Sequence, residues 1–185
     1  MNIEEQNEIS NVIGDFRAAL ETLDRYDHQQ LELPKAGMDY GETNGPITYE
    51  QAMEAISVLK VKFNDSSIFG MEKDMSFRSS LGQIYQTFDG KELYSTVQMK
   101  AAMLLYLLVK NHSFVDGNKR IAAFIFLWYM LRNGLLYRAD GSKVLSDSAL
   151  VALTLLIAES KTEECKIIVK PSAGTGGRLD QCRSY

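Results

Sequence analysis

Apolar residues near the N-terminus recur three and four positions apart, with acidic and amide residues between them. This spacing places them on one face of a helix, and such a face is normally buried against the rest of the protein. The positions are Ile9, Val12, Ile13, Phe16, Ala19, Leu20 and Leu23. The pattern therefore predicts one amphipathic helix over this stretch.

A second apolar face follows Thr48. Thr48 and Gln51 have the spacing of a capping box, in which each side chain bonds the backbone N–H of the other residue. The face itself comprises Ala52, Ala55, Ile56, Leu59 and Phe63. We therefore predict a helix that starts at Thr48.

Two later stretches are apolar on every side. Residues 101–109 follow Ser95-Thr-Val-Gln98, which again has capping-box spacing, and Arg120 to Arg132 is followed by Gly134, a residue suited to a left-handed helix end. A helix that is apolar all round lies inside the protein. The sequence thus predicts two buried central helices, with a further apolar helix from about Asp147 to Ala158.

A short β-hairpin is predicted between Ile84 and Tyr94, where apolar and aromatic residues flank the turn dipeptide Asp89-Gly90. The expected fold is mainly α, a helical bundle around two buried central helices with this one hairpin. Tyr26 to Pro46 lacks periodicity and is interpreted as a linker, so residues 1–45 are expected to form an N-terminal helix and linker. The composition changes again at Pro171, which predicts a disordered tail over residues 171–185.

Composition and charge narrow the classes of function. A chain of 185 residues can bury roughly 70% of its unfolded surface and needs no staple to fold. Its net charge of -4 disfavours nucleic-acid binding, because such proteins carry excess positive charge. Cys165 and Cys182 have no metal-ligand spacing, which indicates a reducing compartment. No export signal is apparent, and the apolar run from Ile121 to Leu131 is shorter than the roughly 20 residues of a membrane span, so a cytoplasmic protein is expected.

The two central helices are separated by a polar break whose composition requires an explanation. It reads Asn-His-Ser-Phe-Val-Asp-Gly-Asn-Lys-Arg over residues 111–120. The first N–H groups of a helix lack intrahelical partners and attract anions, so Gly117, Asn118 and Lys119 could cradle a phosphate. Arg120 could bind phosphate oxygens with its planar guanidinium. The break is therefore a candidate phosphate site.

Two further residues of the break have chemistry that suits a phosphate site. Asp116 offers the hard oxygen that Mg²⁺ takes together with phosphate oxygens and water. His112 has the side chain best suited to accept a proton from an attacking hydroxyl near neutral pH. Taken singly, His112 is more often a helix cap, Asp116-Gly117-Asn118 a turn, and a cation a solvated charge. Their ordered combination between two buried helices favours the chemical interpretation.

The string His112-Ser-Phe-Val-Asp116-Gly-Asn-Lys-Arg120 resembles the signature of the Fic/Doc (Fido) family, HxFx(D/E)GN followed by a basic segment. The resemblance covers residues 46–170, the expected Fic/Doc core. It implies a helical transferase that moves a phosphate-containing group from ATP to a hydroxyl of a target protein, with Mg²⁺ as cofactor. It implies His112 as general base, Asp116 as metal ligand, and Gly117, Asn118, Lys119 and Arg120 as the nucleotide and phosphate site. The hairpin would be the flap that docks the target, through Ile84, Tyr85, Gln86, Thr87 and Phe88.

Two positions depart from the adenylylating members' fuller pattern, HxFx(D/E)GNGRxxR. Lys119 replaces its second glycine and Ala123 replaces its second arginine. The ending resembles instead the death-on-curing toxin branch, HxFxDANKR, which phosphorylates a translation elongation factor, although Gly117 replaces that branch's alanine. Phosphoryl transfer to a target such as a translation factor is therefore the leading hypothesis. Adenylyl transfer and a non-catalytic nucleotide-binding module remain as alternatives.

The family's inhibitory motif, [S/T]xxxE(G/N), has only a near match in Ser160-Lys-Thr-Glu-Glu164-Cys165. We interpret this segment as a frayed helix end, because Ala123 offers no arginine with which the glutamate could pair. Inhibition would then come from a partner antitoxin protein. Gly174-Thr-Gly-Gly177 only superficially resembles a phosphate loop, since no strand precedes it and no helix follows.

Overall fold

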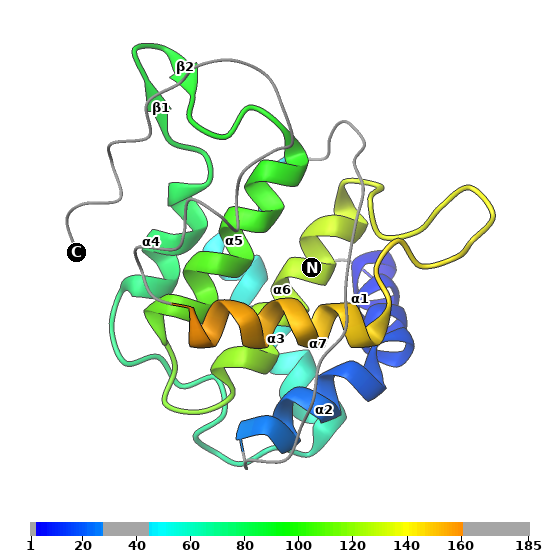
Figure 1. The fold of residues 1–185 in the computed structure, drawn as a ribbon. Coiled ribbons are helices and arrows are strands. Elements are labelled where there is room, and N and C mark those ends of the chain that lie inside the picture. The colour runs from blue at the N-terminus through cyan, green and yellow to red at the C-terminus, as the bar shows by residue number, and fades with distance from the viewer. Residues whose placement is uncertain (1–2, 28–44, 161–185) are drawn as a thin grey trace.

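The computed structural model describes residues 3–27 and 45–160. Over these residues the fold is mainly α with one two-stranded hairpin, as predicted (Figure 1). The elements are α1 (Ile3–Asp15), α2 (Arg17–Asp27), α3 (Tyr49–Phe63), α4 (Ser76–Gln83), β1 (Thr87–Phe88), β2 (Lys91–Glu92), α5 (Val97–Asn111), α6 (Asn118–Arg132) and α7 (Asp147–Glu159). Several predictions fall outside the described residues: most of the linker, Cys165 and Cys182, the segment after Ser160, the Gly174–Gly177 string and the tail over 171–185.

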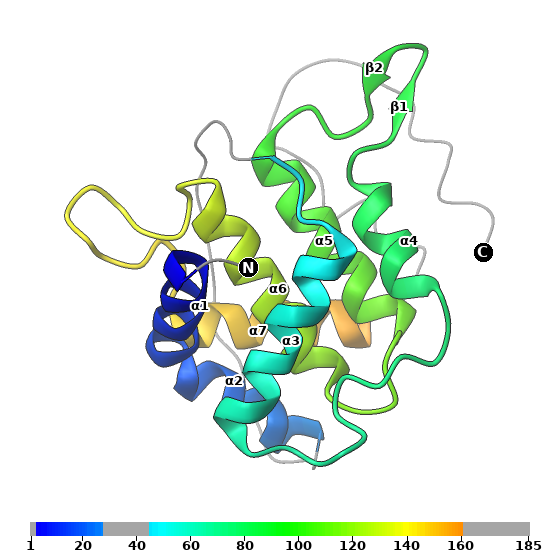
Figure 2. The ribbon, with the colours of Figure 1, turned by 180° about the vertical axis from the view of Figure 1, so that it is seen from behind.

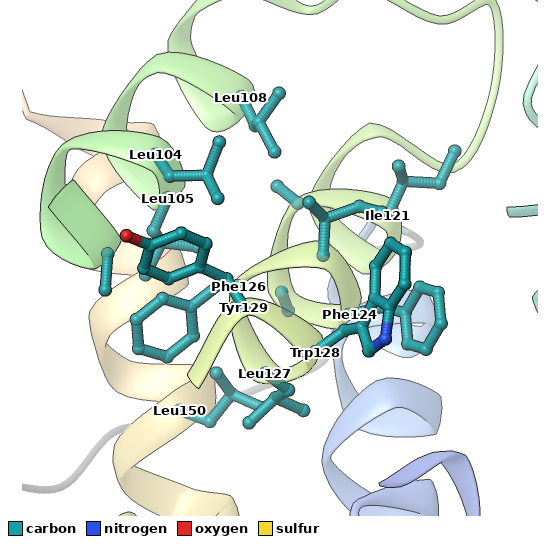
Figure 3. Packing of buried hydrophobic residues seen from close by; sticks show 14 of the residues in the cluster. Leu104, Leu105, Leu108, Ile121, Phe124, Phe126, Leu127, Trp128, Tyr129 and Leu150 are labelled. Atoms are coloured by element: carbon teal, nitrogen blue, oxygen red, sulfur yellow. The ribbon is translucent and has the colours of Figure 1, made fainter. Parts of the chain in front are cut away.

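The two predicted central helices are α5 and α6, which run antiparallel and pack against each other (Figure 1). α7 crosses one side of this pair, and the view from behind shows α3 on the other (Figure 2). Large apolar side chains of α6 fill the space between the helices; Ile121, Phe124, Leu127 and Trp128 are all almost wholly buried (Figure 3). The pair is thus held rigid by its apolar surroundings, and so are the chain ends that lead into the polar break.

The N-terminal prediction was right about burial and wrong about continuity. All seven apolar positions of the predicted helix are buried, from Ile9 to Leu23. The structure has two helices there, α1 and α2, which meet at Phe16. Gly14, a residue of low helix propensity, lies just before the break. Both helices pack on α6, so the apolar stripe continues although the helix does not.

Helix capping largely follows the sequence signals. Thr48 and Gln51 form the predicted capping box at the start of α3. At α5 the prediction was one residue out, because Thr96, and not Ser95, accepts a hydrogen bond from the N–H of Met99. Gly134 adopts the expected left-handed conformation after α6, with φ of 68°.

The hairpin forms where it was predicted. Thr87 pairs with Glu92 and Phe88 with Lys91. Asp89 and Gly90 both have positive φ, 50° and 71°, as the tight turn between twisted strands requires. The short α4 helix was not predicted; the hydroxyl of its first residue, Ser76, donates to Ser113 in the polar break, and the chain leads from its last turn into the hairpin (Figure 1). No helix among the described residues is long and apolar enough to cross a membrane.

Candidate functional site

The polar break forms a loop that connects the end of α5 to the start of α6. His112 ends α5 in the left-handed conformation, with φ of 46° and ψ of 47°. Its side chain is exposed, whereas Ser113 and Phe114 after it are buried. This left-handed residue turns the chain sharply out of the helix, so the imidazole lies at the surface at the mouth of the loop.

The loop is closed by the side chain of Asn118, the first residue of α6. Its Oδ1 accepts a hydrogen bond from the backbone N–H of Phe114 at 2.8 Å, and its Nδ2 donates to the carbonyl of Phe114 at 2.7 Å. The Phe114 ring packs inward on Phe77 of α4, with 4.9 Å between ring centroids. Asn118 is thus a structural clamp in this conformation, and its predicted contact with phosphate would involve the backbone.

A segment between α3 and α4 runs beside the loop and bonds to its backbone. The N–H of Val115 donates to the carbonyl of Met71, and the N–H of Lys73 donates to the carbonyl of Ser113, both at 2.8 Å. Glu72 lies opposite Phe114 in this short antiparallel bridge. The Tyr49 hydroxyl donates to Glu72, and this hydrogen bond raises the pKa of Tyr49 above its usual value. The backbone of this segment therefore supports the loop along one side.

Asp116 is partly exposed, and both of its carboxylate oxygens accept hydrogen bonds. Oδ1 accepts from the N–H of Gly117 at 2.7 Å, and Oδ2 lies 3.4 Å from the hydroxyl of Ser66. A single carboxylate held in this way fits Mg²⁺ only together with phosphate oxygens and water, which is the usual coordination of this ion in nucleotide sites. Among the described residues no group of three or more His, Cys, Asp and Glu side chains could hold a metal without them.

Gly117 is required by both backbone shape and packing. Its φ is 83°, and a Cβ added there would lie 2.2 Å from Cε2 of Phe69. Gly117 is also the N-cap of α6, which has no side-chain cap, whereas α3, α5 and α7 are capped by Thr48, Thr96 and Ser146. The start of α6 can therefore offer its positive end to an anion.

The two cations of the motif lie in different environments. Lys119 is partly exposed in the first turn of α6. Arg120 is only 5% exposed, and its Nη1 lies 2.6 Å from Oδ2 of Asp65. The guanidinium also lies over the rings of Phe63 and Phe69, at 5.3 and 4.9 Å from their centroids. In this structure Arg120 faces away from solvent, so its predicted phosphate contact stays a prediction that would need the side chain to move.

The structure does not bring the predicted flap next to the loop. The hairpin contacts the first turn of α5, where Lys100 Nζ lies 2.8 Å from Oε1 of Glu92. His112 follows the other end of this 15-residue helix, about 22 Å along its axis. Of the five predicted flap residues, Ile84 is buried, Tyr85 is partly buried, and Gln86, Thr87 and Phe88 are exposed. Their docking role stays a prediction. The backbone that supports the loop belongs to residues 69–73.

Sequence reasoning missed the residues that hold the loop from outside. Ser76, the first residue of α4, donates its hydroxyl to that of Ser113 at 2.8 Å, and Asn111 donates to Ser80 at 2.8 Å. Asp65 and Phe69 contact Arg120 from the other side. None of these residues belongs to a periodic pattern or a motif. Asp65 and Phe69 reach Arg120 through tertiary packing, so no signal in the sequence could have identified them.

Residues 46–130 match the model of the Fic/DOC family. No match was found among curated proteins or among solved structures. The matched region begins just before α3 and ends near the end of α6, so it contains the whole loop and both helices that hold it. This match shows that this part of the chain is similar to the Fic/DOC family.

Proposed function

We propose that this protein uses ATP and Mg²⁺ to transfer a phosphate-containing group to a hydroxyl of a target protein, with phosphoryl transfer as the leading reaction. The observation that carries the proposal is the loop itself. An exposed histidine, a carboxylate and an uncapped helix start lie within seven residues, His112 to Asn118, and two buried helices fix them. Catalysis of phosphoryl transfer depends mainly on such positioning and on charge neutralisation.

Each group of the loop has one part in this reaction. His112 would accept the proton of the attacking hydroxyl while the hydroxyl oxygen bonds to the γ-phosphorus, the bond from that phosphorus to the β,γ-bridging oxygen breaks, and ADP leaves. The first N–H groups of α6, with Lys119, would bind the phosphate oxygens. Asp116 would hold Mg²⁺, which would supply charge neutralisation to the phosphates. The loop would keep these groups at fixed positions relative to one another, because the side chain of Asn118 bonds the backbone of Phe114 and holds the turn closed.

Phosphoryl transfer is favoured over adenylyl transfer by the residue types at two positions. Lys119 and Ala123 replace a glycine and an arginine of the adenylylating pattern. Ala123 is wholly buried in α6, so an arginine there would have to be accommodated inside the core. Adenylyl transfer is the second candidate, because both reactions use the same base, carboxylate and anion site and differ only in which phosphorus is attacked.

ATP labelled at the α-phosphate or at the γ-phosphate distinguishes the two reactions. Each is incubated with the protein, Mg²⁺ and a cell lysate, and labelled proteins are identified by the mass they gain. We expect label from the γ position only, and its loss in His112→Ala. Label from the α position alone would replace phosphoryl with adenylyl transfer. If neither label is transferred although the protein binds ATP, a non-catalytic nucleotide-binding module would be favoured instead.

The proposal includes two partner proteins, one that is modified and one that inhibits the enzyme. The target is a protein, with a translation factor as the first candidate, and an antitoxin protein would hold the enzyme inactive. The proposed location is the cytoplasm, where ATP and Mg²⁺ are present. Co-purification of the His112→Ala variant from cells, followed by mass spectrometry, would identify either partner.

A further inference from the structure

A buried ion pair connects the loop after α3 to the first turn of α6. Nη1 of Arg120 and Oδ2 of Asp65 are 2.6 Å apart, and the side chains are 6% and 14% exposed. The rings of Phe63 and Phe69 cover the guanidinium at 5.3 and 4.9 Å. A buried pair of this kind fixes geometry, because a partner left alone in the core would be strongly unfavourable.

Asp65 is itself held firmly. The N–H of Asp65 donates to the carbonyl of Lys60 at 3.1 Å, after Asn64 ends α3 in a left-handed conformation. Nζ of Lys60 donates to the carbonyls of Ser67, at 2.7 Å, and of Phe69, at 3.2 Å. The segment after α3 that carries the Asp65 carboxylate is therefore fixed to the end of α3 by these hydrogen bonds.

The same ring that covers Arg120 also packs on the loop. Phe69 occupies the space in which a Cβ of Gly117 would lie, and Gly117 is the residue from which α6 starts. The N–H of Gly70 donates to the carbonyl of Asp116 at 3.3 Å. Asp65, Arg120 and Phe69 therefore act together on the backbone of the predicted phosphate site.

We propose that Asp65 is a positioning residue for the nucleotide site, and that Arg120 acts through its position rather than as a phosphate ligand. Asp65 holds the guanidinium, the guanidinium and Phe69 hold the first turn of α6, and that turn presents its N–H groups and Lys119 to phosphate. This inference rests on the proposed function for the identity of the ligand. It leaves Lys119 as the motif side chain that binds phosphate directly.

A competing account makes opposite predictions. If Arg120 bound phosphate and Asp65 merely occupied it, Asp65→Asn would release the guanidinium and tighten ATP binding. If Arg120 bound phosphate independently of Asp65, Arg120→Met would weaken binding and Asp65→Asn would not. If Asp65 positions Arg120, both substitutions break the same ion pair, and each should weaken MgATP binding by the same amount.

The test is a double-mutant cycle with MgATP as the ligand. The affinity of MgATP is measured by calorimetry for the full chain and for Asp65→Asn, Arg120→Met and the double variant. We expect each of the three to bind about tenfold more weakly than the native chain, with the double variant no weaker than either single one. Tighter binding by Asp65→Asn, or additive losses in the double variant, would overturn the proposal.

Asp147→Asn is the matched control. It removes the carboxylate of another ion pair, in which Nζ of Lys143 lies 2.8 Å from Oδ1 of Asp147. Asp147 is the first residue of α7 and lies far from the loop in the sequence. It should leave the affinity for MgATP unchanged, so a general loss of stability is separated from misplacement of the site. Asp65→Glu keeps the charge and replaces Asp65→Asn should that variant fail to fold; its longer side chain should give an affinity between those of the native chain and Arg120→Met.

A second measurement separates this inference from the proposed function. The N–H of Phe114 is bonded to Asn118, so its hydrogen exchange reports loop closure without any ligand. We expect faster exchange at Phe114 in Asp65→Asn and Arg120→Met, and native exchange in Asp147→Asn. Failure of the native chain to bind MgATP would contradict the proposed function. Hydrogen exchange at Phe114 that stays at the native rate in both Asp65→Asn and Arg120→Met would instead contradict the role of Asp65.

Discussion

At the scale of single residues, Gly117 shows how the loop depends on the segment beside it. Its positive φ alone would accept asparagine or aspartate at a modest cost. The ring of Phe69 removes that freedom, since it lies where any side chain would begin. Alanine, which the death-on-curing pattern HxFxDANKR has at this position, would clash with the Phe69 ring. This packing explains why the present sequence has glycine there.

Gly117→Ala should destabilise the protein more than Gly134→Ala. Both glycines have positive φ, 83° and 68°, but a Cβ at Gly134 would meet no atom within 4 Å. We expect Gly134→Ala to lose about 1–2 kcal/mol from backbone strain, and Gly117→Ala to lose about 1–3 kcal/mol more from the clash with Phe69. Urea unfolding measures both. Equal losses would show that Phe69 moves aside at little cost.

His112→Asn should abolish transfer and preserve the fold. Asparagine tolerates the left-handed conformation that His112 adopts, but its amide cannot serve as a general base. We expect an unfolding midpoint and an affinity for MgATP close to native, with activity reduced by about 100-fold or more. Native activity in this variant would remove His112 from the mechanism.

At the scale of elements, the hairpin and the loop lie at opposite ends of α5, so their roles can be tested separately. Phe88 on the hairpin is 65% exposed and far from His112. We expect Phe88→Ser to leave stability within about 0.5 kcal/mol of native and MgATP binding unchanged, because a lone exposed side chain contributes little. KM for a protein target should rise without a change in kcat. An unchanged KM would argue against docking on the hairpin.

The start of α4 gives the loop a pH-dependent support. The Asp74 carboxylate accepts hydrogen bonds from Ser76, which lower its pKa below the usual 3.8. Ser76 in turn donates to Ser113 in the loop. A lowered pKa means that the charged carboxylate stabilises the folded state above about pH 4, and that this contribution disappears as the pH falls through the lowered value.

Asp74→Asn should remove this contribution. We expect the variant to be less stable than the native chain at pH 7 and the two to converge in acid, because the protonated Asp74 no longer differs in charge from asparagine. Urea midpoints between pH 7 and pH 3 measure the difference. A difference that stays constant over this range would mean that the charge of Asp74 is not what stabilises the start of α4.

Elements were predictable from the sequence to the extent that their residues carry a repeating pattern or a turn signature. α3, α5, α6, α7 and the hairpin follow from apolar periodicity, caps and Asp89-Gly90. α4 did not, because eight residues with three buried positions give too short a pattern. The loop residues were found from their order alone, but Asp65 and Phe69 reach Arg120 only through tertiary packing, which no local signal encodes.

At the scale of the whole molecule, the N-terminal helices belong to the same core as the loop. The sequence suggested a boundary near residue 45, and the family match also begins at residue 46. Yet Phe16 and Leu20 are wholly buried, α1 and α2 both pack on α6, and α2 also packs on α7. The matched region therefore lacks part of the packing that holds its own central helix.

Removal of residues 1–45 should abolish cooperative folding of the remainder. Phe16→Ala is the milder test, and it should lose about 3–5 kcal/mol because it leaves a cavity in the core. Thermal unfolding followed by circular dichroism measures both. A truncated chain with a native-like, cooperative transition would show that residues 46–185 form an independent unit.

The two hydrogen bonds between Asn118 and Phe114 also bear on the thermodynamics of ligand binding. A loop that is already closed loses little conformational entropy when a ligand arrives, since its backbone was ordered when the chain folded. Affinity at this site is then linked to the stability of the fold around it. Heat or denaturant that opens the loop would weaken binding before the protein unfolds, and a bound ligand would in turn raise the temperature at which the loop opens.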